Sequence, residues 1–158
     1  MGIESETIGA TATAGPGAQL ALQAVYLKDC SFEAPQGPRV TNDWNPHIGL
    51  DLNTSVSVIE GDLREVLLTV TVSAKQGEQT AFLVEVKQAG AFLMQNLSNE
   101  DFRRAAGVIC PGVLFPYVRS VVSSLVSQGG FPQLLLPPVN FEALFAANNP
   151  GTASAAQN

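Results

Sequence analysis

The chain has 158 residues and a net charge of −6, with 14% charged and 46% hydrophobic side chains. This length suits a single domain. The acidic balance argues against nucleic acid and anionic membranes as partners, because both are bound through clustered Lys and Arg. A chain with so many apolar and so few charged side chains is expected to leave apolar surface exposed, which another copy of the chain covers.

Both ends of the chain are rich in small and polar residues and have no apolar period. We expect a disordered arm at 1–19, a domain at 20–147 and a disordered tail at 148–158. Acidic residues near the start do not suit a signal peptide, so a cytoplasmic protein is expected. In that setting Cys30 and Cys110 are expected to be buried thiols, with a single disulfide as the alternative.

The first two thirds of the domain alternate with the period of β-strands. The first strand is expected at 20–31, with Val25, Leu27, Asp29, Ser31 and Glu33 on one side. After a Pro- and Gly-rich loop that contains Trp44, strands are expected at 48–58, 63–74 and 81–92. Tight turns after Glu60 and Gln76 predict an antiparallel meander, with a long crossover loop after the first strand.

The last third is expected to be helical. Ser98 followed by Asp101 resembles a capping box, which predicts a helix from Asn99 to about Ile109 that stops before Pro111. A second helix is expected at 112–128, with Pro116 in its first turn and Gly129-Gly130 at its end. The apolar face of this helix includes Leu114, Val118, Val121 and Leu125. Asn140 is placed to cap a short final helix that ends near Ala147.

These elements predict an α+β fold in which one face of a four-stranded sheet packs on a long helix. From Ala105 onward only Arg119 and Glu142 are charged, so one sheet leaves apolar helix surface uncovered. We therefore expect an oligomer with helices inside and sheets outside. The uncharged run 120–141 is long enough to span a bilayer, but its glycines and prolines make it a poor membrane helix.

Motifs for catalysis are missing from the sequence. His47, the only histidine, has Asp51 as a possible orienting partner, but we expect a solvated strand residue. Asp29 and Glu33 are about 13 Å apart on an extended strand, too far for paired acid–base chemistry. No nucleotide or zinc motif is present. The sequence thus predicts no enzyme, no cofactor and no metal site, and favours a binding protein with a groove near Trp44 and residues 131–136.

Several strings of residues resemble the SecB family of bacterial protein-export chaperones. The resemblance runs in order from Leu20 to Ala146. Its strongest segments are Asp29–Pro35, Asp43–Pro46, Thr80–Val86, Cys110–Tyr117 and Phe131–Phe145.

This resemblance implies a homotetramer, a dimer of dimers, that holds precursor proteins unfolded and delivers them to the ATPase SecA. The residues that match the family's SecA contacts are Asp29, Glu33, Leu83 and Glu85. The residues that match its substrate groove are Trp44, Ile48, Leu50, Leu52, Phe131, Leu134 and Leu136. For the oligomer interface the resemblance implies Val84, Val86 and Gln88, to which the helix pattern adds Val118, Val121 and Leu125.

Two other functions remain open on sequence alone. A SecB-like general or toxin–antitoxin-associated chaperone would share the groove and the fold but would not need SecA. A passive adaptor would use the apolar surface only for assembly. The acidic residues of the matched SecA contacts favour export over the first alternative.

Overall fold

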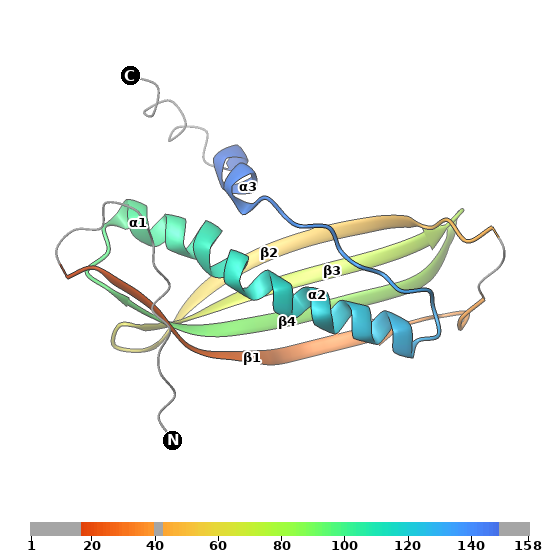
Figure 1. The fold of residues 1–158 in the computed structure, drawn as a ribbon, viewed down its shortest axis with the longest axis horizontal. Coiled ribbons are helices and arrows are strands. Elements are labelled where there is room, and N and C mark those ends of the chain that lie inside the picture. Colours follow the sequence, from red (N-terminus) through yellow and green to blue (C-terminus); the bar gives the residue numbers. More distant parts are fainter. Residues whose placement is uncertain (1–16, 40–42, 149–158) are drawn as a thin grey trace.

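The computed structural model describes residues 17–39 and 43–148, which form a four-stranded antiparallel sheet with a long helix on one face (Figure 1). This is the α+β fold expected from the sequence. The arm expected at 1–19 and the tail expected at 148–158 lie outside the described residues, apart from residues 17–19 and 148.

The sheet has the order β1-β4-β3-β2. Its strands are β1 (Gln19–Glu33), β2 (His47–Glu60), β3 (Leu63–Gln76) and β4 (Gln79–Gln95). Strands β2, β3 and β4 form the predicted meander, and the link from β1 to β2 crosses from one edge of the sheet to the other. The end of β1, the start of β2 and the β3–β4 turn therefore share one end of the sheet.

Strand β3 shows why one face of this sheet is buried. Its alternate residues from Val66 to Ala74 are fully buried beneath the helix, as its period-two pattern predicts. In β4, the side chains of Phe82, Val84 and Val86 point to the same face, since they pair with the buried residues of β3. The opposite, outer face carries most of the polar residues of both strands, whereas Gln88 of β4 is buried on the helix-covered face.

The prediction for β1 was wrong in one respect. Val25 and Leu27 pair with Gly90 and Gln88 on the helix-covered face, whereas Asp29 pairs with Lys87 on the outer face. A register shift between Leu27 and Asp29 inserts one extra residue. Because side chains alternate with period two, one extra residue moves every later side chain to the other face.

The helical region is continuous, so the predicted stop before Pro111 was also wrong. The structure has α1 at Asn99–Arg104, a π-helical turn η1 at Ala105–Ile109, and α2 at Cys110–Gln128. Ser98 caps α1 as expected, with its Oγ accepting a hydrogen bond from Asp101 N–H at 3.0 Å. Pro116 lies inside the helix rather than in a first turn.

The π turn gives a physical reason for this continuity. Pro111 has no N–H to donate, and a proline ring normally clashes with the carbonyl four residues earlier. Directly before Pro111, Cys110 N–H bonds to Ala105 O, a longer loop than the α-helical one. This wider turn, with Gly107 inside it, places Pro111 without ending the helix.

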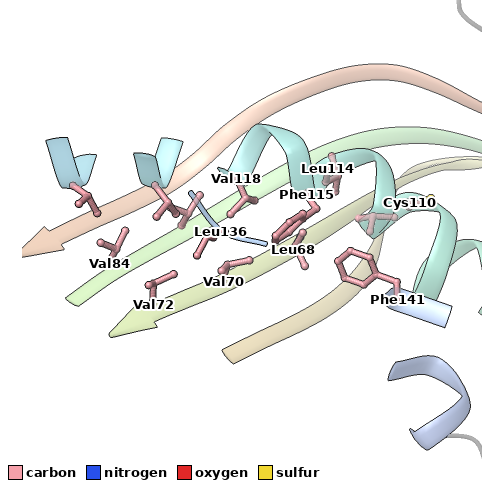
Figure 2. Close-up of a cluster of buried hydrophobic side chains, with 14 of the residues drawn as sticks. Leu68, Val70, Val72, Val84, Cys110, Leu114, Phe115, Val118, Leu136 and Phe141 are labelled. Carbon is pink, nitrogen blue, oxygen red and sulfur yellow. The ribbon is translucent and has the colours of Figure 1, made fainter. Parts of the chain in front are cut away.

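Helix α2 lies along the sheet and supplies the other half of the core, including Leu114, Phe115 and Val118 (Figure 2). The helix Asn99–Gln128 is long and apolar enough to cross a membrane, with a mean hydropathy of 1.5. The core helix of a soluble protein meets the same two criteria, and here one helix face is buried against the sheet.

After Gly129 and Gly130 the chain returns along the sheet as an extended segment, residues 131–140, and ends in α3 (Phe141–Asn148) (Figure 1). Asn140 caps α3 as predicted, because its Oδ1 accepts a hydrogen bond from Ala143 N–H at 3.0 Å. Arg119 Nε, on α2, donates to the carbonyl of Leu136 at 2.7 Å and fixes the segment to the helix.

Candidate functional site

Four aromatic rings meet at the end of the sheet that holds the β3–β4 turn. Phe131, which follows α2, lies at the centre of the cluster. Its ring centroid is 5.0 Å from that of Phe82, 5.7 Å from that of Trp44 and 6.3 Å from that of Phe32. Rings at such distances attract each other beyond simple burial. The cluster brings together four separate parts of the chain, including the loop that carries Trp44.

A cavity of about 310 Å³ opens beside this cluster, with Trp44 and Phe131 in its wall. We call it the Trp44 cavity. Its remaining wall is polar or small: Gln36, Gly37, Arg39, Gln76, Gln79, Thr80 and Ala81. An apolar wall with a rim of amide groups can take an apolar side chain and bond the backbone that carries it. The sequence pattern did not predict that these glutamines line a cavity, because a turn motif does not indicate where the side chains beside it point.

A second cavity, of about 230 Å³, lies at α3. We call it the α3 cavity, and its wall includes Leu52, Gly107, Phe141, Leu144 and Phe145. Phe141 and Phe145 are four residues apart, so they share a face of α3. This spacing was a signal in the sequence that the prediction of the groove left unused.

The residues expected to form a groove are only partly brought together. Trp44 and Phe131 line one cavity and Leu52 lines the other, while Ile48 and Leu50 lie on the same face of β2 between these two. Leu50 is 39% exposed.

The Leu134–Leu136 triplet divides as its extended shape requires. Leu134 is half-buried and Leu135 is 62% exposed, but Leu136 is only 1% exposed. Leu136 packs between α2 and the sheet, near Val70 and Val118 (Figure 2). In this chain it therefore contributes to the core and lines neither of the two cavities.

The outer face of the sheet gathers the four residues matched to SecA contacts. Glu33 is directly opposite Leu83, and Ser31, between Asp29 and Glu33, is opposite Glu85. The bulge in β1 is what turns Asp29 and Glu33 to this face. Lys87 lies among them and is 3.9 Å from Glu85, at an exposed position where such a pair contributes little.

A polar cluster on the same face joins β1 to β3 across β4. Glu65 accepts a hydrogen bond from the Tyr26 hydroxyl and pairs with Lys28 at 2.6 Å. Burial, together with the Glu65 carboxylate, raises the pKa of Tyr26 to about 12. The hydrogen bonds from Lys28 and then from Tyr26 lower the pKa of Glu65. Ala89 and Ala91 of β4 are small enough for these side chains to meet above them.

The residues expected at an oligomer interface fall into two groups. Val84, Val86, Gln88 and Val118 are already buried within one chain, between the sheet and α2. Val121 and Leu125 are half-buried at the edge of that contact. The exposed face of α2 carries Tyr117, Ser120, Ser124 and Ser127 instead.

The residues considered for catalysis or metal binding do not come together in the described part of the chain. His47 is exposed at the start of β2, as expected. In the described ranges, no three or more His, Cys, Asp or Glu residues are grouped so that they could hold a metal ion. Both cysteines are free thiols. Burial raises the pKa of Cys110 to about 12, but Cys30 is exposed on the edge strand β1, so its expected burial was wrong for this chain.

Comparisons with known proteins agree with this fold. Residues 13–151 match the family model described as preprotein translocase subunit SecB. The protein-export protein SecB of Ectopseudomonas mendocina is 47% identical over 144 residues, which cover 90% of this chain and 89% of that protein. That of Pseudomonas fluorescens is 49% identical over 131 residues, 82% of each.

Among solved structures, a SecB-like chaperone from Mycobacterium tuberculosis, in complex with a peptide from an antitoxin, has the same fold. The TM-score is 0.67 at 16% identity, and the match covers 77% of this chain and 91% of that one. At this identity the likeness concerns the fold alone. The family model spans the sheet, the helices and both cavities, and with relatives 47% and 49% identical the chain therefore belongs to the SecB family.

Proposed function

We propose that this protein is an ATP-independent chaperone that holds precursor proteins unfolded in the cytoplasm and passes them to the ATPase SecA. The observation that carries this proposal is the Trp44 cavity, where an apolar wall stays open in the folded chain. Unfolded proteins expose apolar and aromatic side chains, which such a cavity binds without reading a sequence.

The two cavities suit an extended client. They lie near opposite ends of the segment 131–140, with the half-exposed residues of β2 between them. Burying one large apolar side chain contributes roughly 1.5–3 kcal/mol. Several side chains bound together reach the about 8 kcal/mol that corresponds to micromolar affinity.

Assembly into a tetramer, as a dimer of dimers, fits the exposed face of α2. Its serines allow another helix to approach closely, and a cavity of about 400 Å³ beside them has Leu135 in its wall. Four chains would place several grooves on one particle, which raises the avidity for a long client. Val84, Val86 and Val118 would then support the interface from beneath α2 rather than form it.

Delivery to SecA is proposed through the outer face of the sheet, where Asp29, Glu33, Leu83 and Glu85 lie together. The names of the relatives at 47–49% identity, protein-export protein SecB, favour this function over a chaperone that works without SecA. We propose no catalytic activity and no cofactor, so the release of the client is left to the partner ATPase.

The test is whether the chain delays the refolding of a chemically denatured, slow-folding precursor. We expect stoichiometric delay without ATP, and a Trp44→Ala variant about tenfold weaker in affinity for the precursor, since one anchor is lost. Val58→Ala, an exposed apolar residue of β2, is the matched control and should bind as the native chain does. Refolding at the unassisted rate in the presence of the native chain would contradict the proposal.

A further inference from the structure

The carboxamide of Gln76 bonds to the loop backbone on both sides of Trp44. Asn45 N–H donates to Gln76 Oε1 at 3.1 Å, and Gln76 Nε2 donates to the carbonyl of Asp43 at 3.0 Å. A side-chain amide carries the same donor and acceptor as a peptide group. It therefore holds the backbone around Trp44 much as a residue of a neighbouring strand would.

Pro46 explains why the β2–β3 ladder does not extend to the backbone around Trp44. The β2–β3 ladder begins at the pair His47–Lys75, and Pro46 has no N–H with which to extend it. Proline also keeps Asn45 in an extended conformation. The ladder therefore offers no partner to the backbone groups of Asp43 and Asn45, and Gln76, the next residue of β3, bonds to both.

Gln76 itself is held firmly. It is the last residue of β3 and pairs with Gln79 across the tight turn at Gly77, whose φ is +64°. Its side chain is half-buried and lines the Trp44 cavity. The loop is thus bonded to the β3–β4 hairpin, at the place where the indole of Trp44 packs against the ring of Phe131.

We infer that Gln76 is the positioning residue that fixes Trp44 against Phe131, so that the Trp44 cavity is formed before a client binds. This inference rests on the proposed function for its meaning, but the placement of Trp44 is measurable without a client. Without the two bonds, the loop samples other conformations, and affinity falls in proportion to the competent fraction.

The chain supplies its own probe, because Trp44 is the only tryptophan. Two variants separate the parts of the contact. Gln76→Met keeps the length of the side chain and removes both bonds, whereas Gln76→Glu keeps the acceptor for Asn45 N–H but sets an oxygen against the Asp43 carbonyl. Gln95→Met is the control. It removes a glutamine side chain that donates to Asp62 at the other end of β4, at 3.5 Å.

We expect both Gln76 variants to shift Trp44 emission to longer wavelength, to increase its quenching by acrylamide, and to weaken affinity for a denatured precursor about tenfold. Gln95→Met should change none of these. Far-ultraviolet circular dichroism checks that each variant is folded, and Gln76→Glu serves if Gln76→Met does not fold.

Three results would overturn the inference. If Trp44 emission and quenching are native-like in both Gln76 variants, Gln76 does not position the indole. If they change while affinity for the precursor is retained, the placement of Trp44 has no role in binding. If Gln95→Met causes the same changes, the effect is not specific to this contact. A native chain that binds no precursor contradicts the proposed function instead, and the fluorescence result still decides whether Gln76 positions Trp44.

Discussion

The ring of Phe32 lies against the backbone of Gly129, where α2 ends. Its Cε1 atom is 2.6 Å from the point that a Cβ on Gly129 would occupy, and the ring of Phe131 is 3.3 Å from that point. The closeness of β1 to the end of α2, and with it the aromatic cluster, therefore depends on the absence of a side chain at this residue.

Gly129→Ala is expected to destabilise the chain by about 1–3 kcal/mol, the usual cost of forcing extra volume into a packed site. The backbone is not the cause, because Gly129 has an α-helical conformation with φ −71° that alanine also adopts. Urea unfolding followed by circular dichroism measures the change.

Gly112→Ala is the matched control, since nothing lies within 4 Å of its added Cβ. Alanine at this helical residue should raise stability by about 0.5–1 kcal/mol. Equal stability of Gly129→Ala and the native chain would show that Phe32 moves aside freely.

The acidic residues of the outer face give the second prediction. Replacing Glu85 by Lys should weaken binding to SecA about tenfold, because a lost attraction is replaced by a repulsion at a partly exposed charge. Asp29→Lys should act in the same way. Binding is measured by titration calorimetry with purified SecA, at low and at physiological salt.

Asp51→Lys tests whether the effect is specific. Asp51 is also exposed on the outer face, but on β2, at the opposite edge of the sheet from β1. Asp51→Lys makes the same change in net charge as Glu85→Lys. Because Asp51 lies away from the proposed docking residues, this variant should leave the affinity for SecA nearly unchanged. Equal losses in all three variants would indicate general electrostatic attraction rather than a docking site.

The sequence predicted much of this arrangement because the period of β3 and β4 is regular. Alternation in these strands placed Leu83 and Glu85 on one face and Val84 and Val86 on the other, as observed. In β1 the same reasoning failed at Lys28. A bulge adds one residue without any marked change in composition, so its position depends on pairing with β4, which a local pattern does not contain.

The site was less predictable than the fold. Trp44 and Phe131 stood out as large apolar residues in loops, but Leu136 looked the same and is buried in the core. The direction of a side chain in residues 131–140 is set by the contact with α2, including the bond from Arg119 to the Leu136 carbonyl. The contact of Gln76 with the backbone around Trp44 could not be predicted, because the β1–β2 loop and the β3–β4 turn meet only in the folded chain.

The exposed face of α2 gives the third prediction. If four chains assemble as proposed, Ser124→Arg should reduce the mass measured by light scattering to that of a smaller assembly, since a bulky charge on this face prevents close helix contact. Ser55→Arg, on the outer face of β2, carries the same charge and should keep the native mass. An unchanged mass in Ser124→Arg would place the interface elsewhere.

The cluster of Tyr26, Lys28 and Glu65 predicts how stability depends on alkaline pH. The pKa of Tyr26 is raised from 10.0 to about 12 in the folded chain, so folding favours the protonated hydroxyl. Its contribution is complete below pH 10 and is lost as the pH rises towards 12. At pH 8 the native chain should be about 1 kcal/mol more stable than Tyr26→Phe, which lacks the bond to Glu65.

This advantage should shrink steadily as urea unfolding is repeated between pH 10 and 12, until Tyr26→Phe is at least as stable as the native chain. The two proteins differ only in this hydroxyl, so the difference between them isolates Tyr26. A difference between native and Tyr26→Phe that stays constant across this range would mean that the hydroxyl is not bonded to Glu65 in solution.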